Sequence, residues 1–319
     1  MIRFEQVSKE YTNGTYAVNS LDFEIKKGEF FVLIGPSGSG KTTTLKMINR
    51  LISLTRGTVW INDKKISDYD INELRWNIGY VLQQIALFPH MSIAENIAVV
   101  PELLHWDKQR IANRVDELLT LVGLDPASYR NRKPSELSGG QQQRIGVVRA
   151  LAGDPEILLM DEPFSALDPF SREKLQDDLL TIQREIKKTI VFVTHDMREA
   201  LKLGDRICVM KEGEIVQIGT PNELLTNPVN DFVREFVGSG RNLTIKLEDL
   251  IIPISQLADI PSSENAISIS ADLDEVLEEL MNTDSLPVKH NGEVTGVVNR
   301  QHVLKYLADY VRKGGREHE

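Results

Sequence analysis

The residues best suited to chemistry lie at 35–43, between an apolar run that predicts a buried strand and a pattern that predicts a helix. Their order matches G-x-x-x-x-G-K-[ST], in which glycines let backbone N–H groups turn inward around an anion. The helix that follows adds its positive end, the lysine a charge for β- and γ-phosphates, and the first threonine a hydroxyl for Mg²⁺. A glycine-rich turn without a ligand is the disfavoured alternative. We expect a nucleotide triphosphate here, held by Gly35, Ser37, Gly38, Ser39, Gly40, Lys41, Thr42 and Thr43.

Two later apolar runs also end in residues that can do chemistry. The run at 157–160 ends in Asp161 and Glu162, and the run at 189–194 ends in His195. Adjacent acids at a strand end face opposite ways, so Asp161 can hold Mg²⁺ through water while Glu162 addresses an attacking water. A single histidine after a strand is more often structural. His195, however, falls at the carboxyl edge of the predicted parallel sheet, where ligands of such folds bind.

A second anion site is predicted at Ser138, Gly139 and Gly140, directly before a helix expected over 141–152. A hydroxyl, free N–H donors and a helix dipole would all point to one place there. A capped helix without a ligand is the alternative.

Two aromatic segments suggest contacts with other molecules. Tyr11 stands just before a predicted turn, where it could stack on an adenine ring or pack at the edge of a hairpin. Gln83 follows a predicted strand at 78–82, and the apolar, aromatic loop that runs on to residue 93 suggests a surface that docks something.

The composition limits the classes of protein that remain possible. With 319 residues the chain has room for about two domains. The single cysteine, Cys208, cannot form an internal disulfide or supply a cysteine metal cluster. No apolar run approaches the roughly 20 residues needed to cross a bilayer, and no signal peptide is visible, so we expect a cytosolic protein. The net charge of −10 argues against a general nucleic-acid surface.

The pattern of elements predicts an α/β domain followed by a small α+β domain. Antiparallel strands are expected at 2–7 and 17–25, a hairpin at 57–66, and a helical part at about 84–155. Residues 238–242 are glycine-rich and predict a linker between domains at 1–237 and 243–319. In the second domain a strand at 267–270, a helix from 273, a hairpin through Asn291 and Gly292 and a helix at 300–311 are expected.

In this order and spacing, the motifs of residues 1–237 resemble the ATP-binding subunit of an ABC transporter. The family pattern assigns Tyr11 to adenine stacking, residues 35–43 to Walker A, Gln83 to the Q-loop and residues 137–144 to the LSGGQ signature. It assigns Asp161 and Glu162 to Walker B and its catalytic base, Asp168 to the D-loop and His195 to the switch histidine. The resemblance implies a P-loop ABC ATPase fold with a RecA-like core, an antiparallel β subdomain and a helical subdomain.

The resemblance also implies cofactors, roles and partners. ATP and Mg²⁺ would bind, with Glu162, His195 and Gln83 catalytic and with Thr42, Gln83 and Asp161 around the metal. Two copies of the chain would pair head to tail, so that the signature of one subunit contacts the nucleotide held by the other. A membrane permease would dock near residues 83–93 and hold the subunit at the cytoplasmic face of the membrane, and an extracytoplasmic solute-binding protein would act indirectly.

Within the family, the chain resembles importer ATPases for glycine betaine, carnitine, choline and proline. The second domain resembles a single cystathionine-β-synthase (CBS) motif, for which pairing with the copy of a second subunit is expected. Asn299 and His302 replace the Thr or Ser and the Asp of an adenosine-binding CBS motif, so a ligand sensor and a plain dimerisation domain both stay open. Alternatives are an importer ATPase for another small solute such as an amino acid, a non-transport ABC ATPase, and a nucleotide sensor without turnover.

Overall fold

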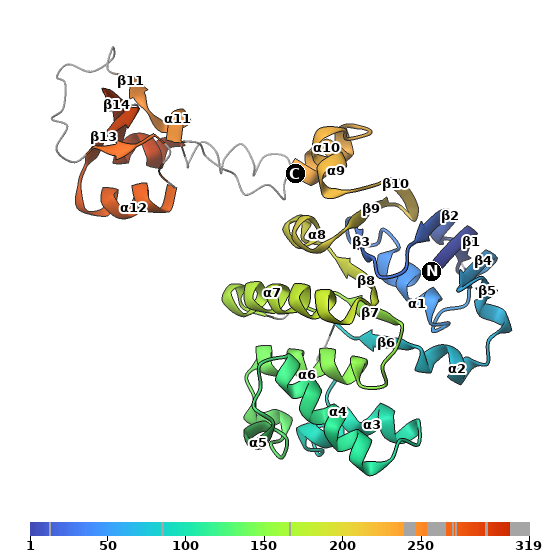
Figure 1. The fold of residues 1–319 in the computed structure, drawn as a ribbon. Helices are drawn as coiled ribbons and strands as arrows, with labels where there is room; N and C mark the ends of the chain where they lie inside the picture. Colours follow the sequence, from blue (N-terminus) through green and yellow to red (C-terminus); the bar gives the residue numbers. More distant parts are fainter. Residues whose placement is uncertain are drawn as a thin grey trace. The chain divides into compact units, whose positions relative to one another are not determined.

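The chain divides into two compact units, Met1–Arg241 and Asn242–Glu319, each with its own hydrophobic core (Figure 1). The structure is a computed structural model that describes residues 1–12, 14–83, 86–165, 167–238, 247–253, 266–269, 271, 273–290 and 293–306. The predicted linker lies outside these residues except for Gly238, which is the last residue of helix α10 (Asp231–Gly238). None of the helices described is long and apolar enough to span a bilayer.

The first unit is organised around a six-stranded sheet in the order β10-β9-β3-β8-β7-β6. The strands are β3 (Phe30–Ile34), β6 (Ile78–Val81), β7 (Ile157–Asp161), β8 (Thr189–Thr194), β9 (Arg206–Lys211) and β10 (Glu214–Gly219). All neighbouring pairs are parallel except β9 and β10. The residues of β3, β7 and β8 are wholly buried, as expected for central parallel strands. The predicted α/β class is confirmed, and the carboxyl ends of β3, β8 and β7 lie side by side.

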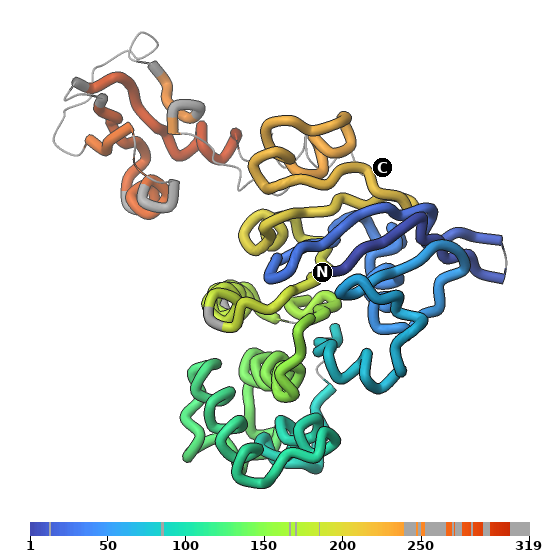
Figure 2. The backbone as a smooth tube through the Cα atoms, turned by 45° about the vertical axis from the view of Figure 1, so that its right-hand side comes forward, coloured from blue at the N-terminus to red at the C-terminus, as the bar shows by residue number. Residues whose placement is uncertain are grey.

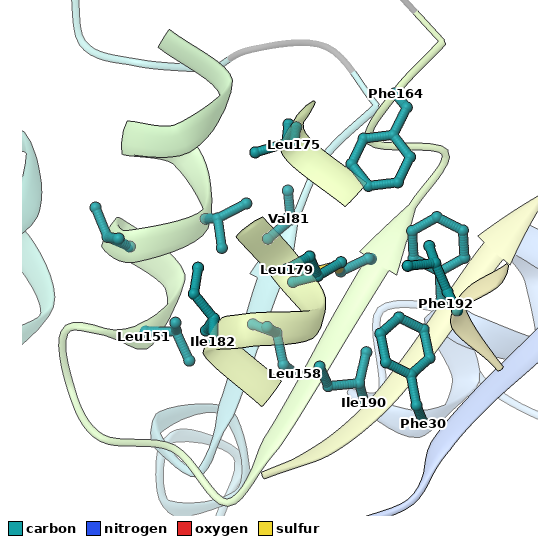
Figure 3. Packing of buried hydrophobic residues seen from close by; sticks show 14 of the residues in the cluster. Phe30, Val81, Leu151, Leu158, Phe164, Leu175, Leu179, Ile182, Ile190 and Phe192 are labelled. Carbon is teal, nitrogen blue, oxygen red and sulfur yellow. The ribbon is translucent and has the colours of Figure 1, made fainter. Parts of the chain in front are cut away.

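Helix α7 (Pro169–Ile186) covers one face of this sheet with a stripe of apolar residues. Leu175, Leu179 and Ile182 are buried at helical spacing and lie over the sheet residues (Figure 3). The Phe192 ring of β8 lies between Phe164 and Phe30, with ring centroids 5.4 and 5.8 Å away. Full burial of each such side chain contributes about 1.5–3 kcal/mol, so this face fixes the start of α7 beside the carboxyl edge of the sheet.

An antiparallel sheet packs on the other face, together with helix α1 (Lys41–Ile48). Its order is β2-β1-β4-β5, formed by β1 (Ile2–Glu10), β2 (Tyr16–Ile25), β4 (Arg56–Ile61) and β5 (Lys64–Lys65). Asn62 and Asp63 have φ values of 48° and 60°, as a two-residue hairpin turn requires. The strand pair and the hairpin predicted from the sequence are therefore present.

Four helices form a layer beside the sheet, seen at the bottom of Figures 1 and 2: α3 (Ile93–Leu103), α4 (Lys108–Leu121), α5 (Pro126–Tyr129) and α6 (Gly139–Leu151). Ser92 and Glu95 form a capping box at the start of α3. Helix α6 lies directly on β6. The contact is so close that a Cβ atom at Gly79 would lie 2.4 Å from the Ala150 carbonyl oxygen. The remaining elements are η1 (Ile66–Asp68), α2 (Ile71–Trp76), η2 (Pro134–Glu136), α8 (Met197–Leu203) and α9 (Pro221–Thr226).

The second unit is a small sheet in the order β11-β14-β13-β12, with helices α11 (Leu247–Leu250), α12 (Leu273–Asn282) and 300–306. Its strands are β11 (Ile252–Pro253), β12 (Ile267–Ser268), β13 (Ser285–His290) and β14 (Glu293–Asn299). The predicted β13–β14 hairpin is present, although its turn at 291–292 lies outside the described residues. Strand β11, which pairs with β14, is an element that the sequence did not predict.

Candidate nucleotide-binding and catalytic site

The loop after β3 is closed around Lys41. The Lys41 side chain is buried, and its Nζ donates to the carbonyl oxygens of Gly35 and Pro36 at 2.8 and 2.9 Å. Burial lowers the pKa of Lys41, and the nearby carboxylates of Glu162 and Asp161 oppose that shift. The ammonium group therefore stands in the loop where phosphate oxygens could be further acceptors.

Gly40 has to be glycine in this loop for two independent reasons. Its φ is 97°, in the region that other residues rarely adopt, and a Cβ atom would lie 2.4 Å from the carbonyl oxygen of Ala17. The turn into α1 thus depends on β2, which supplies Ala17, as well as on β3. Ser39, one residue earlier, is almost fully buried.

Thr42 and Asp161 are in direct contact, although they are far apart in the sequence. The Thr42 hydroxyl donates to Asp161 Oδ1 at 2.8 Å, the Tyr80 hydroxyl donates to Oδ2 at 3.2 Å, and Lys46 Nζ lies 3.7 Å from Oδ2. Burial and the charge of Asp161 raise the pKa of Tyr80, so its phenol stays a donor. The sequence prediction missed Tyr80 and Lys46; the only signal was a tyrosine within an apolar strand.

The donor set at this pair fits Mg²⁺. A hydroxyl and a carboxylate offer oxygen ligands, and Mg²⁺ is usually held by one or two carboxylates together with phosphates and water. No group of three or more His, Cys, Asp or Glu side chains that could hold a metal occurs among the described residues, as this mode of binding allows. The structure places Gln83, the third predicted ligand, against Glu162.

The side chains of His195 and Gln83 both contact the same carboxylate oxygen of Glu162. His195 Nδ1 lies 3.0 Å from Glu162 Oε2, and Gln83 Nε2 donates to the same oxygen at 3.4 Å. Because a carboxylate only accepts, the contact assigns the proton to Nδ1 of His195. Glu162 has a φ of 46°, a conformation that costs about 1–3 kcal/mol in a non-glycine residue, and its N–H donates to Val193 O. Glu162 thus has other side-chain partners than Asp161, which contacts Thr42 and Tyr80.

Ser138, Gly139 and Gly140 lie at the N-terminus of α6, but the helix begins at Gly139 rather than at the predicted Gln141. The reason is a capping box: Ser138 Oγ accepts from the Gln141 N–H, and Gln141 Oε1 accepts from the Ser138 N–H. The two glycines therefore belong to the first turn, where backbone N–H groups have no partner within the helix.

Tyr11 and Asp168 have structural surroundings that leave their predicted roles open. The Tyr11 side chain is 46% exposed, and Lys9 Nζ lies 5.4 Å from the ring centroid. Asp168 caps α7 by accepting from the Ser171 N–H at 3.0 Å.

The loop predicted to dock a partner exposes an aromatic side chain. Gln84 and Ile85 lie outside the described residues, and Phe88 is 41% exposed. Arg149 donates to Ala86 O at 2.7 Å and lies over the Phe88 ring, and burial lowers its pKa. The loop is thus anchored to α6.

Comparison with known proteins agrees with this geometry. Residues 18–165 match the family model described as ABC transporter, and residues 257–309 match that of the CBS domain. The chain is 50% identical over 309 residues to the glycine betaine/carnitine/choline transport ATP-binding protein OpuCA of Bacillus subtilis, covering 97% of this chain and 78% of OpuCA. It is 47% identical over 303 residues to the glycine betaine uptake system ATP-binding protein YehX of Escherichia coli, covering 94% and 95%.

Solved structures show the same fold for the first unit. The ATP-binding cassette MJ0796, in a dimeric post-hydrolysis state bound to ADP and Pi, aligns with a TM-score of 0.62 at 37% identity. The alignment covers 69% of this chain and 99% of that one.

Proposed function

The chain belongs to the family of ABC transporter ATP-binding proteins, and from this premise we propose that it hydrolyses ATP to drive import of a betaine-type or quaternary-ammonium solute through a separate permease. The observation that carries the proposal is the convergence of Glu162, His195 and Gln83 beside the loop that holds Lys41. The names of the relatives supply the solute class.

The chain's own residues divide the work of binding. Lys41 offers its ammonium group to the β- and γ-phosphates, and the N–H groups of residues 38–43 surround them. Thr42 and Asp161, which are joined by a hydrogen bond, would hold Mg²⁺, with Gln83 as a further oxygen donor. When bound, Mg²⁺ neutralises charge on the phosphate oxygens. Tyr80 and Lys46 keep the Asp161 carboxylate in place.

Hydrolysis requires a water molecule aligned with the γ-phosphate. The Glu162 carboxylate accepts a hydrogen bond from this water and takes its proton as the new P–O bond forms, while the bond from the γ-phosphorus to the bridging oxygen breaks and ADP leaves. His195 contacts Glu162 through Nδ1, so its Nε2 remains for a phosphate oxygen. Gln83 links this carboxylate to the loop that continues toward Phe88.

Two copies and a permease complete the assembly in this proposal. Ser138, Gly139 and Gly140 of one subunit contact the γ-phosphate bound by the other, which makes the dimer isologous. The first-turn N–H groups of α6 are suited to that contact. The permease docks on the loop with the exposed Phe88, which places the subunit at the cytoplasmic face of the membrane. An extracytoplasmic binding protein delivers the solute.

Replacing Tyr11 by alanine is expected to weaken ATP binding about 5- to 150-fold, because stacking of a base on an aromatic ring contributes about 1–3 kcal/mol. Tyr16, at the start of β2, is a matched control: it is 39% exposed and equally aromatic. Calorimetric titration with ATP measures both variants. Adenine stacking on Tyr11 is contradicted if Tyr11→Ala and Tyr16→Ala lose the same amount of ATP affinity, or if neither variant loses any.

Co-purification from native membranes tests the whole proposal. The chain is tagged, extracted in detergent, and its partners are identified by mass spectrometry. Recovery of a permease and a solute-binding protein is expected, and the latter can be screened against betaine, carnitine and choline. Recovery of ribosomes or DNA-repair factors instead of membrane proteins contradicts the import function and leaves the ATPase.

A further inference from the structure

A buried carboxylate anchors β8, the strand that ends just before His195. Thr194, the last residue of β8, donates from Oγ1 to Glu199 Oε2 at 2.5 Å and accepts from the Asp196 N–H at 3.0 Å. Thr194 and Glu199 are 2% and 5% exposed. Burial raises the pKa of Glu199, an effect opposed by the hydrogen bond from Thr194. The turn that carries His195 therefore starts from a fixed point on α8.

Arg172, in the first turn of α7, lies between this turn and the loop that ends at Asp168. Its Nη2 donates to the carbonyl oxygen of Leu167 at 3.2 Å. Its Nη1 lies 3.9 Å from Asp196 Oδ2, and its Nε lies 4.0 Å from Glu199 Oε1. Asp196, which follows His195, Glu199, which binds Thr194, and Leu167, which precedes Asp168, thus all face one guanidinium group.

Each carboxylate also has hydrogen-bond partners besides Arg172. Glu199 is held by Thr194, and Asp196 caps α8 and binds the side chain of Arg198 at 3.2 Å. The Nε atom of Arg172 is buried and has no hydrogen-bond partner, which is unfavourable for a charged donor. Arg172 is therefore the group that joins two elements, the Leu167–Asp168 loop and the turn around His195.

We propose that Arg172 and Glu199 are positioning residues that hold the Leu167–Asp168 loop and the His195 turn as one unit. His195 then stays within hydrogen-bond distance of Glu162, and a displacement of the Asp168 loop reaches the catalytic carboxylate. The inference rests on the proposed ATPase function but concerns residues that touch neither the nucleotide loop nor Glu162. Arg172 and Glu199 thus influence catalysis through the position of His195.

A double-mutant cycle on the full-length chain tests the proposal. Arg172→Met and Glu199→Gln are each expected to lower kcat about 10-fold with KM for ATP changed less than about 2-fold, since the binding residues are untouched. The double variant is expected to be no slower than the slower single variant, because the two residues act as a unit. Arg184→Met and Glu173→Gln, exposed positions on the same helix, are the controls and leave kcat unchanged.

A second readout is independent of turnover. The NMR signal of the His195 imidazole is expected to shift in Arg172→Met and Glu199→Gln but not in the two controls. Additive losses in the double variant, an unchanged kcat in both single variants, or an unmoved His195 signal overturns the proposal.

If Arg172→Met does not fold, as thermal unfolding reveals, Arg172→Lys with Glu199→Gln completes the cycle, and partial recovery of kcat is expected for the lysine. An inactive wild-type chain contradicts the ATPase function alone, because the His195 signal still decides the positioning.

Discussion

Replacing Glu162 by glutamine is expected to lower kcat for ATP hydrolysis about 10²- to 10⁴-fold, the range that general-base catalysis contributes. Glutamine has the same shape and keeps acceptor and donor groups near His195 and Gln83, but an amide cannot take the proton of the attacking water. ATP affinity is expected to stay within about 2-fold, because the phosphate loop is unchanged. Release of inorganic phosphate and equilibrium binding of ATP measure the two quantities separately.

Glu212→Gln is the matched control for this change. Glu212 also has a positive φ, 51°, but stands exposed at the β9–β10 turn. The control shows whether replacing a glutamate that has a positive φ changes kcat through the backbone, apart from the loss of the catalytic base. Retained turnover in Glu162→Gln would show that another group activates the water. Absent turnover in the wild type would favour a nucleotide sensor.

Lys41→Met is expected to weaken ATP binding about 10- to 100-fold, because hydrogen bonds to a charged group contribute about 1.5–3 kcal/mol. Methionine fills the buried volume of the lysine stem but leaves the carbonyl oxygens of Gly35 and Pro36 without their donor. Lys27→Met, in the exposed turn before β3, is the control. Calorimetric titration with ATP and with adenosine is the measurement.

The choice of ligand makes this experiment specific. Adenosine lacks phosphates, so its affinity is expected to be the same in the wild type and in Lys41→Met. The Tyr11→Ala variant is expected to bind both ATP and adenosine more weakly than the wild type. Equal losses for ATP and adenosine in Lys41→Met would mean that the substitution disturbs the fold of the loop rather than the contact with phosphate.

The fold could be predicted where the sequence pattern is strong. The stretches at 30–34, 157–160 and 190–193 are uniformly apolar, which is the signature of central parallel strands, and the structure places all three in the sheet. The order of the strands could not be read from these runs, because each is apolar on both faces and carries no information about its neighbours. Strand β11 was missed because two residues, one of them Pro253, give no alternation to detect.

The residues gathered at the site could be predicted only where they belong to a motif. Glu162, His195 and Gln83 each follow a strand, and the structure brings them together. Their uses in turnover, like those of Ser138 and Tyr11, stay predictions until the variants above are measured. Tyr80 and Glu199 were missed, because a single polar residue in an apolar strand or a short helix shows nothing of its tertiary partner. The start of α6 was misplaced because glycines weaken helix propensity, and the capping box of Ser138 and Gln141 outweighs them.

The absence of a side chain at Gly79 has a consequence for communication through the molecule. With α6 in backbone contact with β6, the strand that leads to Gln83 and the helix that begins at the signature cannot shift independently. In the proposed assembly, a permease that displaces the loop after β6 would therefore change the affinity of the signature for the second subunit's nucleotide. Linkage makes the effect mutual, so nucleotide binding at the dimer interface must change the affinity for the permease by the same factor.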